Sequence, residues 1–113
     1  LTVAIWFLKH YNLYEAMCYL RSGIIMYNAA SGGKNTSTSG YHETLTLFWI
    51  FIVQAFVQQH QEQNILDLTN TFLVDKMSNK NLPFKYYSKA YLFTTKGRAS
   101  WITPDLKLFE YTM

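Results

Sequence analysis

The longest apolar run of the chain lies between two polar stretches and predicts a buried central helix. Residues 47–53 contain no polar side chain, and residues 58–61 then turn polar with three glutamines and one histidine. The run is also good strand material, and periodicity alone does not separate the two structures. Length favours a helix over 41–61, because this segment contains neither Gly nor Pro and is much longer than a usual strand. Its first half is apolar on nearly every side, so we expect other helices to surround it.

Two further helices are predicted before the central one. Apolar residues at helical spacing indicate a helix over 1–10, and Asn12 is a suitable N-cap for the next, with Glu15 at the capping-box position three residues on. The glycines at 32–33 predict the end of this second helix. Because only one or two residues join the two helices, we expect them to form a tight pair, followed by a polar loop over 31–40.

The pattern becomes shorter and less regular after the central helix. Asn64 or Asp67 begins a helix that we expect to end near Lys76, and residues 78–83 predict a turn. Ser88 is a suitable cap for a short helical piece over 89–92.

One more helical turn is predicted before the tail. Thr94 or Thr95 caps this turn, which we expect to run through Trp101, before Pro104 disfavours further helix. The fold class predicted for residues 1–113 is therefore all-α. We expect a single domain of about four helices around a buried central helix, with an irregular C-terminal segment wrapping over them. The chain begins at Leu1 within apolar sequence, so we also expect its true N-terminus to lie upstream.

Composition adds an expectation about partners and compartment. Half of the residues are hydrophobic and only 15% are charged, which predicts apolar surface that meets either another subunit, as in a homodimer, or a segment missing from this sequence. Cys18 is the only cysteine and permits no intrachain disulfide, so we expect a reducing, cytoplasmic compartment and a buried structural thiol. The apolar stretch over 45–57 has 13 residues, fewer than the roughly 20 that span a membrane, and we predict no membrane partner.

Positive charge is concentrated in the C-terminal part. Residues 76–104 carry five lysines, one arginine and no acid, a charge of +6, which leaves −3 for the remainder of a chain with net charge +3. Aromatic residues within a positive segment are typical of proteins that hold single-stranded nucleic acid, yet they also form ordinary surface over a core. We therefore treat nucleic-acid binding through 76–101 as the least favoured hypothesis. The alternating residues are Lys85, Tyr86, Tyr87, Lys89, Tyr91, Phe93, Lys96 and Arg98.

The start of the central helix holds the most compact set of polar side chains. His42 and Thr46 share one helical stripe, and Glu43 lies beside them. A histidine next to a carboxylate is typical of a divalent-metal ligand or a general base. Adjacent helix residues point in different directions, so any further metal ligand would have to come from His10, His60 or Asp105. The alternative is structural: Glu43 complements the helix dipole and His42 hydrogen-bonds a loop.

The C-terminal segment supplies three more candidate residues. Arg98 and Asp105 bracket a tryptophan and a proline, which predicts a clasp in which Arg98 pairs with Asp105 or Glu43 and the Tyr87 hydroxyl takes part. The competing hypothesis is that Arg98, Tyr87 and His42 converge on a small anionic ligand. Sequence leaves both open.

Three segments together carry a resemblance to a known family. They are Tyr41-His42-Glu43-Thr44-Leu45-Thr46 with Phe48-Trp49, Leu82-Pro83 with Tyr86-Tyr87-Ser88 and Leu92-Phe93, and Arg98-Ala99 with Trp101 and Pro104-Asp105-Leu106. Their order and spacing resemble a widespread family of small, uncharacterised bacterial proteins that includes cyanobacterial members.

The resemblance implies a mainly helical fold and no assigned activity. It also implies a His-x-x-His segment upstream of Leu1, which would join His42 in a site. This chain has Thr95-Lys96 where the family often has Pro-Glu, so an acid at that position is not carried over.

Three functional hypotheses follow. The first is a small-ligand or metal pocket at residues 41–46, drawing on His42, Glu43, Thr46, Tyr87, Arg98 and Asp105, with any catalysis centred on His42. The second is a non-enzymatic interaction module that forms a homodimer, and the third is the weak nucleic-acid binder.

Overall fold

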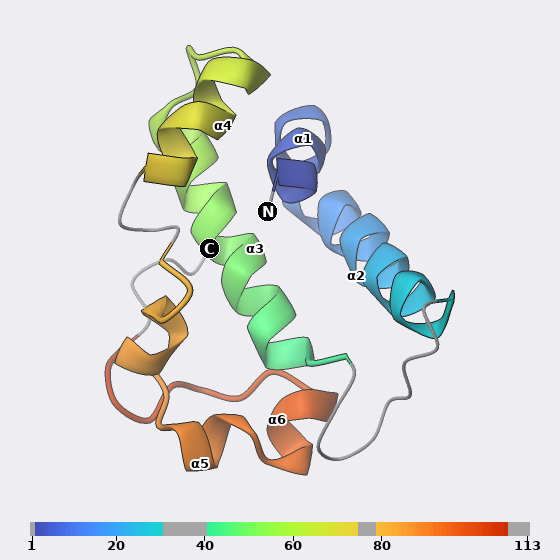
Figure 1. Cartoon of the computed structure of the whole chain (residues 1–113), viewed down its shortest axis with the longest axis vertical. Coiled ribbons are helices and arrows are strands. Elements are labelled where there is room, and N and C mark those ends of the chain that lie inside the picture. Colours follow the sequence, from blue (N-terminus) through green and yellow to red (C-terminus); the bar gives the residue numbers. More distant parts are fainter. Residues whose placement is uncertain (1, 31–40, 75–78, 109–113) are drawn as a thin grey trace.

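The central helix predicted from the apolar run is present and organises the molecule. The computed structural model describes residues 2–30, 41–74 and 79–108, and every regular element in these ranges is helical. Helix α3 (Glu43–Gln59) runs through the middle, with the pair α1 (Thr2–His10) and α2 (Leu13–Ala30) on one side (Figure 1). The all-α prediction is confirmed.

The remaining elements cover the two ends of α3. Helix α4 (Ile65–Val74) follows the C-terminal end, while α5 (Lys89–Leu92) and α6 (Thr95–Ala99) lie beneath its N-terminal end (Figure 1). A 3₁₀ turn, η2 (Leu82–Lys85), connects the two regions. The C-terminal segment is thus a chain of short helices joined by irregular backbone.

Local capping explains several of these boundaries. The Asn12 side chain accepts a hydrogen bond from Glu15 N–H at 2.9 Å, and Asn64 does the same for Asp67 at 2.8 Å. Both caps satisfy backbone donors that the first turn of a helix leaves free. Thr94 caps α6, which ends at Ala99, so the expected extension to Trp101 is wrong. The predicted stop at 32–33, the loop over 31–40 and the helix end near Lys76 lie outside the described residues.

The apolar run of α3 forms the centre of the core, and side chains from the other helices pack around it. Several α3 side chains are completely buried, as expected for a helix that is apolar around its circumference. Residues from the other helices complete one continuous cluster. The fully buried members with the largest side chains are Ile5, Phe48, Ile52, Val53, Phe56, Leu68, Phe72, Tyr87 and Leu92.

Helix α2 buries only a narrow stripe. Leu13, Ala16 and Leu20 face the core at helical spacing, whereas Cys18 lies between them in sequence and points outward. The expectation of a buried thiol is therefore wrong, because the stripe of α2 that meets the core excludes position 18. No helix within the described ranges is long and apolar enough to cross a membrane.

Candidate functional site

His42 is the N-cap of the central helix. Its Nδ1 accepts a hydrogen bond from Leu45 N–H at 3.1 Å, so the ring proton sits on Nε2 and is donated to the Leu92 carbonyl oxygen at 2.9 Å. The ring is buried and meets Phe93 edge to face. Both ring nitrogens of the leading candidate for metal or base chemistry are therefore engaged in holding α3 to α5.

Thr44 makes the second connection between α3 and the C-terminal segment. Its buried hydroxyl lies 2.6 Å from the Gly97 carbonyl oxygen and 2.9 Å from that of Ser100. One hydroxyl proton serves both acceptors, which are carbonyls at the end of the short helix α6. Thr44 thus caps the C-terminal end of α6 while belonging to the first turn of α3.

Glu43 connects the start of α3 to α2 instead of to the C-terminal segment. The Arg21 guanidinium forms a bidentate ion pair with this carboxylate: Arg21 Nη2 lies 2.7 Å from Glu43 Oε2, and Arg21 Nε donates to Glu43 Oε1 at 3.1 Å. The Tyr41 hydroxyl donates to the same carboxylate at 2.5 Å and also hydrogen-bonds the Thr46 side chain. Burial is the largest cause that raises the pKa of Tyr41, to about 12, so it remains a neutral donor.

Asp105 forms a clasp with a partner that the sequence did not indicate. Its Oδ1 accepts from Ser88 N–H at 2.8 Å and its Oδ2 from the Ser88 hydroxyl at 2.6 Å. These bonds lower the pKa of Asp105. A backbone hydrogen bond from Leu106 N–H to the Tyr86 carbonyl, at 2.9 Å, continues the contact. The tail therefore returns to the beginning of α5.

Tyrosine hydroxyls fix the same returning segment. Tyr87 is fully buried and donates to the Ile102 carbonyl at 2.8 Å, and Tyr91 donates to the Thr103 carbonyl at 2.8 Å. Burial, followed by the charges of Tyr91 and Asp105, raises the pKa of Tyr87. The predicted clasp had Arg98 paired with Asp105 or Glu43. The contacts observed are instead Asp105 with Ser88, Glu43 with Arg21, and the Tyr87 hydroxyl with the Ile102 backbone.

The structure brings Arg98 close to His42. The Arg98 guanidinium lies 6.0 Å from the centre of the Phe93 ring, which itself packs on His42. Burial is the main cause that lowers the pKa of His42, and the Arg98 charge lowers it further. The six candidate residues therefore fall into three neighbouring groups: His42 with Arg98, Glu43 with Thr46, and Tyr87 with Asp105.

The other histidines proposed as metal ligands lie elsewhere. His10 and His60 each donate Nδ1–H to the carbonyl four residues earlier, at 2.8 Å to Trp6 and 2.9 Å to Phe56. Each ring also stacks on that earlier aromatic side chain. Among the described residues, no three His, Cys, Asp or Glu side chains come together in a way that could hold a metal ion.

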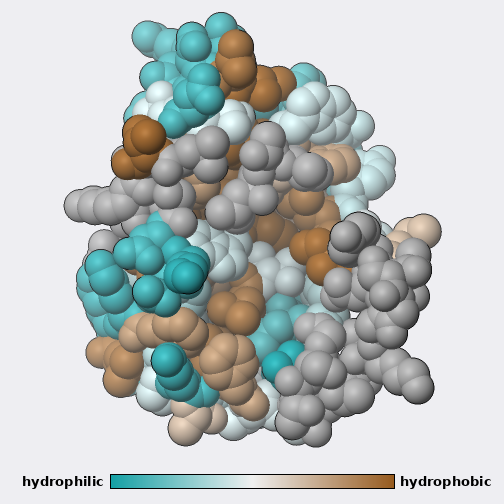
Figure 2. Space-filling model, viewed as in Figure 1, coloured by the Kyte–Doolittle hydropathy of each residue, from teal (hydrophilic) through white to brown (hydrophobic). Residues whose placement is uncertain are grey.

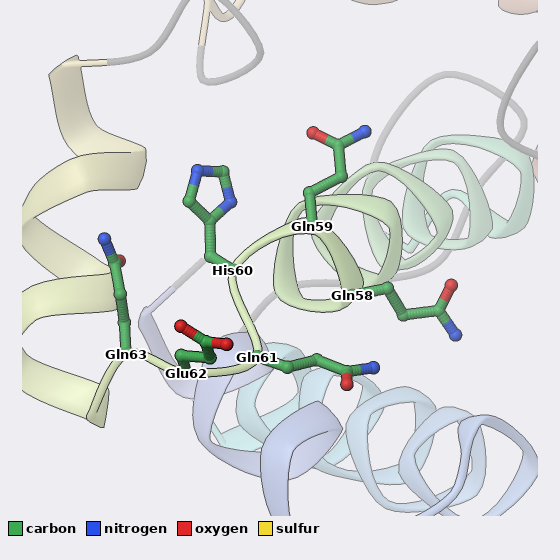
Figure 3. Close-up of a pocket in the computed structure, with 6 residues that line it drawn as sticks. All are labelled: Gln58, Gln59, His60, Gln61, Glu62 and Gln63. Atoms are coloured by element: carbon green, nitrogen blue, oxygen red, sulfur yellow. The ribbon is translucent and has the colours of Figure 1, made fainter.

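A hollow of about 510 Å³ lies at the opposite end of α3 from His42. It is formed by the turn 58–63, where the His60 and Gln63 side chains rise on the same side while Gln58 and Gln61 point away (Figure 3). All six lining residues have polar side chains, and the hollow is separate from the candidate residues at 41–46. It lacks the apolar walls that usually enclose a small ligand.

Two residues that contact this region, Arg21 and Ser88, were not among the candidate residues predicted from the sequence. Arg21 is the only cation of the 13–30 helix, and such a lone cation is a signal that a partly buried acid lies nearby. Ser88 was expected only as a cap, and nothing local connects it to Asp105, seventeen positions later. The polar groups at 41–46 are thus satisfied by α2, α5 and α6.

No family model, no curated protein and no solved structure matches this chain, so the resemblance to the family of small bacterial proteins stays a prediction.

Proposed function

We propose that this chain is an interaction module that forms a homodimer through the outer surface of α1 and α2. The supporting observation is a set of large apolar side chains that stay exposed on these two helices. Large exposed apolar surfaces are rare on soluble proteins unless they bind a partner. The set, called the α1–α2 outer surface below, consists of Trp6, Tyr14, Tyr19, Ile24, Ile25 and Met26.

The second half of α2 carries most weight in this proposal. All residues from Ser22 to Met26 are exposed, so this part of the helix has little packing of its own. Most helical stability in proteins comes from tertiary packing of an apolar face. A partner packed on one face of this segment would supply that packing and remove Met26, the most exposed of these three side chains, from water.

The chemistry of the surface favours a second copy as the partner. Tyrosine, tryptophan and methionine are enriched in protein interfaces. Arg21 is the only cation of α2, and its charge is paired with Glu43. A nearly neutral aromatic surface offers no bias toward a charged partner and suits a two-fold interface with itself.

Replacing Met26 with glutamate is expected to dissociate the dimer. Met26 is 70% exposed, so the monomer tolerates a charge there, whereas an interface would have to desolvate two like charges. We expect at least a tenfold rise in the dimer dissociation constant, corresponding to about 1.4 kcal/mol. Sedimentation equilibrium over the micromolar range measures the change.

Leu66→Glu is the matched control. Leu66 is 69% exposed, nearly the same as Met26, but it lies on α4. It should leave the dissociation constant unchanged. A wild-type chain that remains monomeric throughout the concentration range, or equal effects of the two substitutions, would contradict the proposal.

A further inference from the structure

Two neighbouring aromatic rings lie between two cations at the end of the molecule formed by η2, α5 and α6. Lys89 Nζ lies 5.0 Å from the centre of the Phe84 ring, and the Phe84 and Phe93 ring centres are 6.2 Å apart. The Arg98 guanidinium lies 6.0 Å from the Phe93 ring. These four residues form one continuous row, called the cation–aromatic row below.

The surroundings of the row are positive. Residues 79–104 carry Lys80, Lys85, Lys89, Lys96 and Arg98 and no acid, and all four of these lysines are exposed. Asp105, the next acid along the chain, is engaged with Ser88. Figure 2 shows hydrophilic and hydrophobic surface side by side over this end of the molecule. Such a field attracts anions.

Phe93 gives the row a feature beyond charge. Its side chain is 42% exposed although it is large and apolar, and Phe84 beside it is half-buried. Lysine stems that merely cover a core would hide such a ring from water. An exposed ring between cations can instead stack on a planar group that is linked to negative charge.

We propose that the cation–aromatic row binds single-stranded nucleic acid. A base stacks on Phe93, while Lys89 and the neighbouring lysines contact the flanking phosphates. Stacking on an aromatic ring requires an unpaired base, so single strands are preferred to duplexes. The short helices place the row opposite the polar turn 58–63, and it shares no residue with the α1–α2 outer surface. Dimer formation and nucleic-acid binding can therefore be tested separately.

The test uses the full chain and a fluorescein-labelled oligouridine, with fluorescence anisotropy as the readout over a salt series. Phe93→Leu keeps an apolar side chain against His42 but removes the ring, so affinity should fall about tenfold. Phe93→Tyr keeps the ring and should stay within about twofold of wild type. Thermal unfolding checks that both variants fold.

Two matched lysine substitutions test the phosphate contacts. Lys89→Gln should reduce the slope of log affinity against log salt by about 0.7, the value for one phosphate contact on a single strand. Lys9→Gln removes the same charge from α1, where Lys9 contacts the Gln61 carbonyl, and should leave the slope unchanged.

Several outcomes would overturn the proposal. They are equal affinity for duplex RNA of the same length, wild-type affinity in folded Phe93→Leu, and binding to phosphatidylserine vesicles without binding to oligouridine. The last result would assign the positive surface to lipid headgroups.

Discussion

Replacing Gly97 with alanine is expected to destabilise the fold by about 3 kcal/mol. A Cβ at this position would lie 2.5 Å from the Leu92 carbonyl oxygen and 3.0 Å from the Ile102 side chain. The first contact is with backbone, so no side-chain rotation relieves it. Relief requires α6 to move away from α5, which would also displace the Gly97 carbonyl from Thr44.

Gly23→Ala is the matched control for this prediction. A Cβ there meets nothing within 4 Å, and the residue lies inside α2. Alanine should therefore stabilise the chain by about 0.5–1 kcal/mol through its higher helix propensity. Urea unfolding monitored by circular dichroism measures both changes. If Gly97→Ala lowers the free energy of unfolding no more than a typical surface substitution does, then α5 and α6 are not in close backbone contact at Gly97.

Lowering the pH below neutrality is expected to destabilise the protein through His42. Burial lowers the pKa of His42 in the folded state, and the unfolded chain takes up its proton near pH 6.5. The stability that neutral His42 provides is therefore present above about pH 6.5 and is lost as the pH falls toward the lowered pKa. Protonation of Nδ1 also removes the acceptor for Leu45 N–H. The steepest slope expected from one proton is about 1.4 kcal/mol per pH unit.

Two substitutions separate the helix-capping role of His42 from the effect of its protonation. His42→Asn keeps a capping oxygen without a titrating group and should flatten the pH dependence of unfolding between pH 5 and pH 7, roughly the range in which histidine titrates. His42→Leu removes both hydrogen bonds and should cost about 2–3 kcal/mol at neutral pH. An unchanged pH dependence in His42→Asn would show that His42 is not the group whose protonation destabilises the protein.

The helical fold could be predicted because its signals are local. Asn12 and Asn64 mark helix starts by their own chemistry, and the apolar run of α3 demands burial whatever surrounds it. Thr94 was one of two adjacent candidates for the α6 cap, and the structure selects it. The early end of α6 at Ala99 was missed because the carbonyls there are satisfied by Thr44, a residue far away in sequence.

The contacts of the polar residues at 41–46 were not predictable from the sequence, and a functional site there stays a prediction. The region at 41–46 does hold a compact polar cluster, yet the partner of Glu43 is Arg21, and His42 bonds the Leu92 backbone. A backbone carbonyl carries no sequence signature, and one helical cation can face several directions. Distance in space, not residue type, decides whether such a cluster is a pocket or a set of ties between helices.

The long-range hydrogen bonds at the start of α3 also affect the order in which parts of the chain fold. His42 and Leu92 are separated by 50 positions, and Thr44 and Gly97 by 53. Loops of this length cost more entropy to close than the turn between α1 and α2, so the local helix pair should form first. During synthesis the first turn of α3 lacks these hydrogen-bond partners until residues 92–100 have emerged. Hydrogen exchange on the refolding chain should therefore protect the α3 first turn later than α1.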